Sequence, residues 1–274
     1  MISTPTWATN SFHQKLAAHH APKVFQGLGK DPVGDIFTRI NFDGDFDAYN
    51  NWNNFEQAKK AGSSVYYDVI ETKSHWFITY GFFYPRDYAS ICFWWVCHEN
   101  DFEGMRITVE KSEAKFGFVV LLETLAHGML HFDDSPVVDD DDHVAIVLEA
   151  GGHGVHSRRF RKPDSSTKIY TGNDYVLLPM NDLWITRHQV GAHKMWLGTF
   201  VYKYDSRLKD LPLFFGGTKW GAGGANPPWA WNFFGLKRGE WFFDPATSIC
   251  HTYGCPTGLD SNYVYNPYLD SHSL

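Results

Sequence analysis

Hydrophobic and aromatic residues recur along the chain in short runs that have the length of β-strands. Eight such runs lie at 63–71, 74–84, 91–97, 104–111, 116–126, 143–151, 175–180 and 195–204. In the fourth run, Met105, Ile107 and Val109 alternate with polar residues, which is the period of two that gives a strand two different faces. Many short strands with few helices predict an all-β fold, an antiparallel β-sandwich of jelly-roll type.

Only two segments, 11–24 and 53–61, have the pattern of short peripheral helices. The C-terminal part is rich in Gly, Pro and Trp, and its many aromatic residues favour an ordered loop that wraps the sandwich. No repeat or low-complexity linker divides the chain. We therefore expect a single domain, 1–274, with core strands at about 63–204 and the wrap at about 211–274.

Composition excludes some classes of function. The 274 residues are 43% hydrophobic and 17% aromatic, which is enough for a sizeable core. A formal net charge of -7 gives no electrostatic footprint for nucleic acid. No apolar run approaches the about 18–20 residues that cross a bilayer. The first residues lack the pattern of a secretory signal, so location inside the cell, another export route or a removed leader all remain open.

The four cysteines form two pairs with C-x4-C spacing, Cys92 with Cys97 and Cys250 with Cys255. Zinc sites usually have tighter C-x2-C spacing. Buried thiols, or one or two disulfides, are therefore favoured over a zinc site, and the redox compartment stays open.

A block of polar residues, HENDFEG, directly follows the apolar run ICFWWVC at 91–97. In an extended segment Asp101 and Glu103 point to the same face, and a hairpin-like return would bring Asp87 close to Asp101. Carboxylates that converge with His98 would repel one another at neutral pH unless a cation lay between them. Oxygen ligands with one imidazole favour Ca²⁺ or Mg²⁺, and Mn²⁺ is also compatible. The aromatic run would then be a rigid floor that positions the carboxylates.

A second polar cluster follows another hydrophobic run, in AIVLEAGGHGVHS at 145–157. Glycines beside histidines at the end of a strand indicate a close approach of the backbone to a ligand. The alternative is a loop whose histidines are satisfied by backbone carbonyls. The candidate ligand-contacting residues are Arg86, Glu99, His127, His153 and His156.

Three segments in this order, PRD at 85–87, HENDFE at 98–103 and GGHGVH at 151–156, resemble the superfamily of necrosis- and ethylene-inducing-peptide-like cytolytic toxins and its vacuolar-protein-sorting-associated relatives. The toxins carry P-K-D and then G-H-R-H-D-W-E, and the relatives carry H-x-x-D-W-E and a later K-H-G-H. The match covers roughly residues 64–157. The resemblance implies a secreted β-sandwich with a divalent cation in an acidic cavity, which engages sphingolipid sugar headgroups on plant membranes.

Carried over residue by residue, the resemblance makes Asp87, His98, Asp101 and Glu103 the candidate metal ligands. The chain also departs from the toxins. Asn100 stands where they have a second His, Phe102 replaces Trp, and Glu99 adds a negative charge. The fold and the metal therefore transfer better than cytolytic activity does.

Three hypotheses of function follow. The one we favour is a module that binds a glycan or glycolipid through the cation, with peripheral contact to a membrane. The second is a metal-dependent hydrolase or lyase acting on a small or glycosidic substrate, in which Glu103 or His153 moves protons as the catalytic residue. The third is a metal-free structural sandwich with a solvated acidic rim. The chain lacks the G-x-S-x-G, H-E-x-x-H and phosphate-loop motifs, which disfavours familiar serine-hydrolase and nucleotide chemistry.

Overall fold

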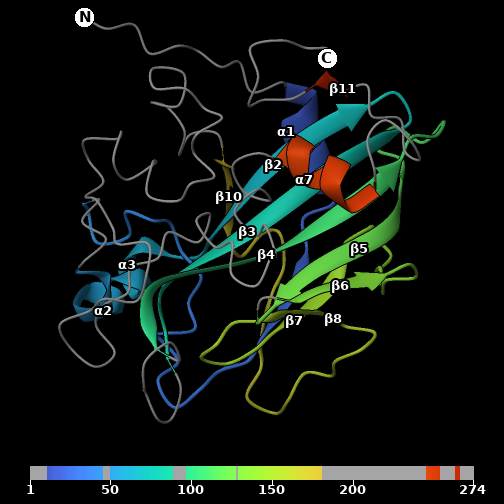
Figure 1. Cartoon of the computed structure of the whole chain (residues 1–274). Helices are drawn as coiled ribbons and strands as arrows, with labels where there is room; N and C mark the ends of the chain where they lie inside the picture. The colour runs from blue at the N-terminus through green and yellow to red at the C-terminus, as the bar shows by residue number, and fades with distance from the viewer. Residues whose placement is uncertain are drawn as a thin grey trace, which may run out of the picture.

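The computed structural model describes residues 11–45, 50–88, 97–127, 129–180, 245–253 and 263–265. Their strands form two sheets that share one hydrophobic core, so the predicted β-sandwich is confirmed (Figure 1). The predicted strand at 195–204, the predicted strand at 91–97 except Cys97, and most of the predicted wrap lie outside the described residues.

The large sheet has seven strands. In chain order they are β2 (Ser64–Thr72), β3 (His75–Asp87), β4 (His98–Glu110), β5 (Phe118–Ala126), β6 (Met129–Asp133), β10 (Val176–Pro179) and β11 (Tyr263–Tyr265). Their order across the sheet is β10-β2-β3-β4-β5-β6, and β11 also pairs with β2. The longest strands, β3 and β4, form an antiparallel hairpin, as the predicted return of the chain requires.

The small sheet has four strands, in the order β8-β7-β1-β9. They are β1 (Lys23–Gln26), β7 (Ala145–Leu148), β8 (Val155–Ser157) and β9 (Lys168–Tyr170). Most strand pairs in the molecule are antiparallel, but β1 with β7 and β10 with β2 are parallel. The sheets are therefore mixed. In both parallel pairs the two strands are far apart in the sequence, which leaves room for the long connection that a parallel pair needs.

The helices are short and peripheral. They are α1 (Ser11–His19), α2 (Asn51–Asn54), the 3-10 helix η1 (Phe55–Gln57), α3 (Ala58–Ala61) and α7 (Pro245–Tyr253). The predicted helix at 11–24 is shorter than expected, because Pro22 does not continue a helix and 23–26 pairs with β7 instead. The second predicted helix is divided into α2, η1 and α3, and it ends at Gly62, whose φ is 76°.

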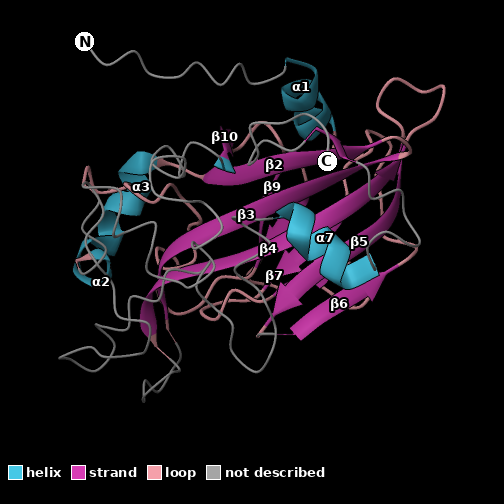
Figure 2. Cartoon of the chain, turned by 45° about the horizontal axis from the view of Figure 1, so that its top comes forward, coloured by secondary structure: helices cyan, strands magenta, loops and turns pink. Residues whose placement is uncertain are grey.

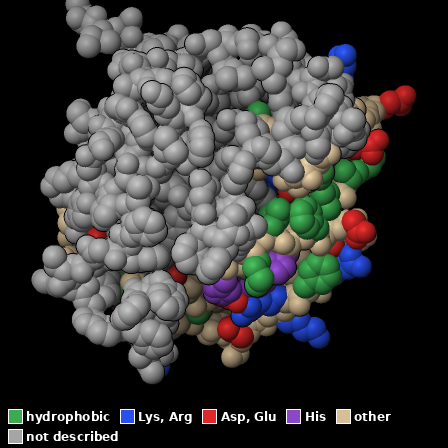
Figure 3. Space-filling model, viewed as in Figure 1, with side chains coloured by type: hydrophobic (Ala, Val, Ile, Leu, Met, Phe, Trp, Pro, Cys, Tyr) green, Lys and Arg blue, Asp and Glu red, His purple; other side chains and the backbone are tan. Residues whose placement is uncertain are grey.

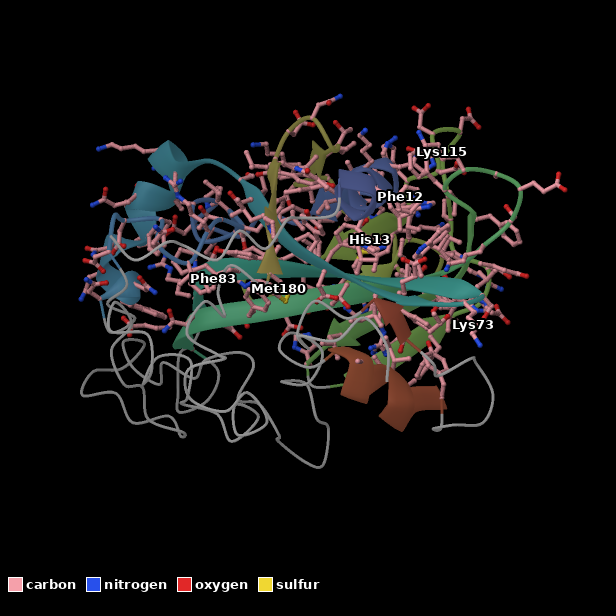
Figure 4. All side chains as sticks on the ribbon, turned by 90° about the horizontal axis from the view of Figure 1, so that it is seen from above. Phe12, His13, Lys73, Phe83, Lys115 and Met180 are labelled. Atoms are coloured by element: carbon pink, nitrogen blue, oxygen red, sulfur yellow. The ribbon has the colours of Figure 1, made fainter. Side chains whose placement is uncertain are left out.

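The hydrophobic core lies between the two sheets. Ile78, Tyr80 and Phe82 of β3 are fully buried against residues of the small sheet such as Ile146 and Leu148. Burial of such side chains contributes roughly 1.5–3 kcal/mol each relative to exposure. The other face of the large sheet is covered by α7, while α1 lies on the opposite side (Figures 2 and 4). Both faces of β3 and β4 are therefore buried.

The described surface has hydrophobic side chains over β5 and β6, beside histidines and charged groups (Figure 3). Phe118, Met129 and Phe132 are each about half exposed there. Among the described helices, none has the length and apolar character needed to cross a membrane. Cys97 is buried and belongs to a disulfide, which is one of the two states favoured from its spacing.

Candidate functional site

The inner face of β4 changes from apolar to acidic toward the start of the strand. Met105 and Ile107 lie in the hydrophobic core, and the alternation of the strand places Glu103 and Asp101 on the same face. Both carboxylate residues are almost fully buried, at 3% and 1% exposure. One end of the sandwich interior is therefore acidic, and the predicted common face of Asp101 and Glu103 is confirmed.

Asp87, at the end of β3, joins this acidic end. It pairs with His98 in the hairpin, while Asp101 pairs with Tyr84. The left-handed backbone of Asn100, with φ 59°, interrupts the regular alternation between these two positions. Burial, together with the neighbouring carboxylates of Asp101 and Glu103, raises the pKa of Asp87 well above its ordinary value. Three carboxylates from two strands thus share one poorly solvated region.

His153 supplies positive charge to this region. It follows β7 in the loop to β8, is fully buried, and stacks on Tyr84 with 3.6 Å between ring centres. Its Nδ1 lies 2.8 Å from Asp101 Oδ2, and its Nε2 lies 3.3 Å from Asp35 Oδ1. Burial alone lowers the pKa of His153, but the two carboxylates raise it to about 10. At neutral pH the ring is an imidazolium.

Asp35 is a member of the site that the sequence analysis missed. It lies between β1 and α2, is fully buried, and accepts hydrogen bonds from the backbone N–H groups of Gly29 and Gly151, both at 2.7 Å. The Tyr88 hydroxyl lies 3.0 Å from Asp35 Oδ2 and 2.6 Å from the Asp31 carbonyl oxygen, so the two acceptors share its one proton. Burial raises the pKa of Asp35, but His153 and the backbone donors outweigh it and leave that pKa below its ordinary value. No spacing or composition signal around Asp35 distinguishes it from a surface turn residue.

His127 and His156 lie at the rim of this region, joined by one carboxylate. The His127 ring contacts Oε2 of Glu149, and the His156 ring contacts Oε1 of Glu149 at 3.0 Å. Arg161 also forms an ion pair with Glu149. The hydrogen bond to Glu149 raises the pKa of His127, and Glu103 and Asp87 add to the effect. His127 is therefore close enough to the acidic end to sense its charge.

The glycines of the loop between β7 and β8 allow close contacts within the chain, whereas the sequence indicates a close approach to a ligand. Gly151 has φ 78°, and a Cβ atom there would lie 2.3 Å from the backbone oxygen of Tyr88. The close approach at Gly151 is therefore to the chain itself. At Gly154, a Cβ atom would come within 3.3 Å of the His127 ring.

Arg86 and Glu99 lie on the side of the hairpin that carries α2. The Arg86 guanidinium is 3.4 Å from the centre of the Phe55 ring and pairs with Asp31. Glu99 Oε1 accepts a hydrogen bond from the backbone N–H of Trp52 at 2.8 Å. Both residues anchor the segment that contains α2. Their predicted contacts with a ligand stay a prediction.

The four predicted metal ligands can be tested only in part. Among the side chains that the structure describes, no group of three or more His, Cys, Asp or Glu is arranged to hold a metal ion. The side chain of His98 is not one of them. The three carboxylates of Asp87, Asp101 and Glu103 do have the donor chemistry that Ca²⁺ and Mg²⁺ prefer. The metal centre therefore stays a prediction. The donor chemistry is suitable, but the described side chains are not arranged around an ion.

Comparison with known proteins returns solved structures but no family model and no curated protein. The chain is similar to necrosis and ethylene inducing protein 2 from the causal agent of cocoa's witches' broom disease, at 16% identity and a TM-score of 0.38, covering 59% of this chain and 72% of that one. It is similar to the non-toxic protein HaNLP3 at 14% identity and a TM-score of 0.41, covering 65% and 81%. NLPPya, solved with glucosamine, has 15% identity and a TM-score of 0.38, covering 61% and 74%. These structures belong to the family that the sequence motifs resemble.

Proposed function

We propose that this chain binds a divalent cation, Ca²⁺ or Mg²⁺, with Asp87, His98, Asp101 and Glu103, and uses the cation to bind a sugar headgroup. The observation that supports the proposal is the convergence of Asp87, Asp101 and Glu103 at one buried end of the sandwich. Buried carboxylates that lie close together are costly unless a positive charge or a proton compensates them.

The raised pKa of Asp87 gives the physical reason for a cation. Burial and the neighbouring carboxylates raise the pKa of Asp87, so in the absence of an ion Asp87 holds its proton to a higher pH than an exposed aspartate does. A divalent cation compensates the negative charge of the cluster more effectively than this proton, because it interacts with all the carboxylates at once. Cation and proton then compete, and cation binding strengthens as pH rises.

The sugar class of the ligand is inferred from the family resemblance. Two structures of the similar protein NLPPya are described as complexes with glucosamine and with mannosamine. When bound, the cation would offer coordination positions to sugar hydroxyl oxygens, which are hard ligands of the type that Ca²⁺ accepts. The rim residues His127 and His156 would contact the same ligand.

We also propose a secreted protein that contacts membranes peripherally. The disulfide of Cys97 supports an oxidising compartment. A sugar headgroup on a glycolipid would bring the rim of the site to the membrane surface without insertion of a helix.

The test is flotation with lipid vesicles that contain or lack a sphingolipid with a sugar headgroup. We expect binding only to the glycosylated vesicles, loss of binding with a chelator, and recovery with added Ca²⁺ or Mg²⁺. Glu103→Gln should abolish the binding. The control Glu113→Gln changes an exposed residue in the turn after β4 and should leave the binding unchanged. Binding that ignores the chelator would overturn the proposal, and release of a cleaved sugar would favour the hydrolase hypothesis.

A further inference from the structure

The carboxylate of Asp35 is held in one orientation by groups from three segments. Its Oδ2 accepts the Gly29 N–H and shares the Tyr88 hydroxyl proton with the Asp31 carbonyl oxygen, and its Oδ1 accepts the Gly151 N–H. Two of these donors are backbone groups, which have no rotamers of their own. A fully buried carboxylate with this many donors is a rigid part of the fold.

The side of Asp35 that faces the interior contacts His153. Asp35 Oδ1 lies 3.3 Å from Nε2, and the opposite ring nitrogen lies 2.8 Å from Asp101 Oδ2. The ring is flat against Tyr84, at an interplanar angle of 5°, so it can rotate only within that plane. Tyr84 is fixed in turn, since its hydroxyl donates to Gln26 Oε1 at 2.7 Å.

Asp35, His153 and Asp101 therefore form a chain of contacts that runs from the loop after β1 to strand β4. The backbone around His153 makes the chain possible, because Gly151 and His153 both have left-handed φ angles, of 78° and 50°. Stacking on Tyr84 fixes the ring plane but not the direction of its nitrogens. Nδ1 is hydrogen-bonded to Asp101, and Nε2 lies 3.3 Å from Asp35 in an ion-pair contact that does not have hydrogen-bond geometry.

We propose that Asp35 is a positioning residue of the cation site, acting through His153 to fix the carboxylate of Asp101. The proposal rests on the proposed function, in which Asp101 is a ligand, but Asp35 itself has no contact with the ion. Groups that orient metal ligands from one layer further out typically change metal affinity 10–100-fold when they are removed. Asp35 has the burial and the contacts for that role.

The test compares Asp35→Asn with Asp31→Asn. The control changes an acidic residue four positions earlier in the same loop, whose side chain pairs with Arg86 rather than His153. Calorimetric titration with Ca²⁺ and with Mn²⁺ should show a 10–100-fold loss of affinity for Asp35→Asn and a change below about threefold for Asp31→Asn. Folding of each variant is checked by circular dichroism.

A second readout follows the ring itself. Nuclear Overhauser contacts between His153 and Tyr84, and exchange-protected ring N–H signals of His153, should be present in the wild type without any cation and weakened in Asp35→Asn. A merely structural role would lower the melting temperature without changing these signals in the folded protein. If Asp35→Asn does not fold, Tyr88→Phe removes one donor to Asp35, and we expect the same changes at smaller amplitude.

Equal cation affinity and unchanged His153 signals in Asp35→Asn would overturn the inference. Failure of the proposed function has a different signature, because the wild type itself would then bind neither ion. If the wild type binds no cation, the His153 ring N–H signals still test whether Asp35 positions His153. Unchanged signals in Asp35→Asn would reject that role.

Discussion

Strand β4 carries two buried polar clusters on its opposite faces, and they differ in how their charges are paired. On the outer face, beneath α7, Arg106 and Glu123 are both fully buried and form a two-pronged ion pair with contacts of 2.6 and 2.7 Å. Ser248 of α7 accepts a further hydrogen bond from Arg106 at 2.9 Å. On the inner face, Asp101 and Glu103 lie near Asp87, and carboxylates outnumber the cationic side chains described there.

The outer cluster contains a two-pronged guanidinium–carboxylate pair, and the inner cluster contains several carboxylates around one buried imidazole. The outer cluster also holds a second buried carboxylate, because Asp68 lies in the same cross-strand row. Burial lowers the pKa of Arg106, but Glu123 and, to a smaller extent, Asp68 raise it above its ordinary value. The guanidinium pairs with Glu123 in good geometry. The inner cluster has the imidazolium of His153 between Asp35 and Asp101, and it still raises the pKa of Asp87. In the proposed function, a bound cation would interact with Asp87, Asp101 and Glu103 together.

The largest expected effect is on the outer cluster. Arg106→Met leaves the Glu123 carboxylate buried without its ion partner, and such a loss costs about 3–5 kcal/mol. Urea unfolding at neutral pH should measure it. The double variant Arg106→Met, Glu123→Leu should recover part of the loss, because it removes the Glu123 charge, although buried Asp68 in the same row also loses the attraction of the guanidinium. A double variant as unstable as the single one would show that the cluster is not a simple ion pair.

The next largest effect is the stabilisation by Ca²⁺, which should depend on the inner cluster and not on the outer one. With Ca²⁺ at about 100 times its dissociation constant, the wild type should gain about 2.7 kcal/mol in unfolding free energy. Glu103→Gln should lose most of this gain, whereas the outer-face double variant should keep it. Denaturant melts with and without the ion provide the comparison, and an equal gain in Glu103→Gln would remove Glu103 from the ligand set.

A smaller effect follows from the pKa of Asp87. Its folded-state pKa lies well above 3.8, so the folded protein holds a proton that the unfolded chain releases. Stability from this group is present below pH 3.8 and is lost as pH rises through the folded-state pKa. In chelator, Asp87→Asn should therefore be more stable than the wild type, by a margin that grows with pH. Thermal melts at several pH values test this, and a margin that shrinks with pH would contradict it.

The smallest effect is expected at the rim. The pKa of His127 is raised above 6.5, so its pairing with Glu149 stabilises the fold below that pH and less as pH rises through the folded-state pKa. Because the His127 side chain is 55% exposed, the contribution should be under about 1 kcal/mol. His127→Gln should show this small loss at pH 6 and none at alkaline pH. A loss of several kcal/mol would place His127 in the structural framework.

Local patterns predicted much of the fold and part of the site. Alternation in β4 and the aromatic runs of β2 and β3 gave the strands, because side-chain period depends on neighbouring residues alone. The hairpin of β3 and β4, which brings Asp87 close to Asp101, was also predictable, because these two strands follow each other in the sequence. The short strand β1 was missed because four residues after a helix carry little pattern of their own.

Residues that act across long sequence distances were not predictable. Asp35 meets Gly151 and His153 more than 110 positions away, and only the completed fold brings them together. Arg106 belongs to the polar half of an alternating strand, which is typical of a solvent-facing side. It is buried because α7, about 140 residues later, covers it. Neither contact leaves a signal in the spacing of nearby residues.

The most direct test of the central claim is a calorimetric titration of chelator-treated protein with Ca²⁺ at a series of pH values from acidic to neutral, in buffers of different ionisation enthalpy. The account predicts saturable binding to one site with release of protons, and reduced proton release in Asp87→Asn, because the ion replaces the proton on Asp87. Heats that do not exceed dilution in the wild type, for Ca²⁺ and for Mg²⁺, would contradict it.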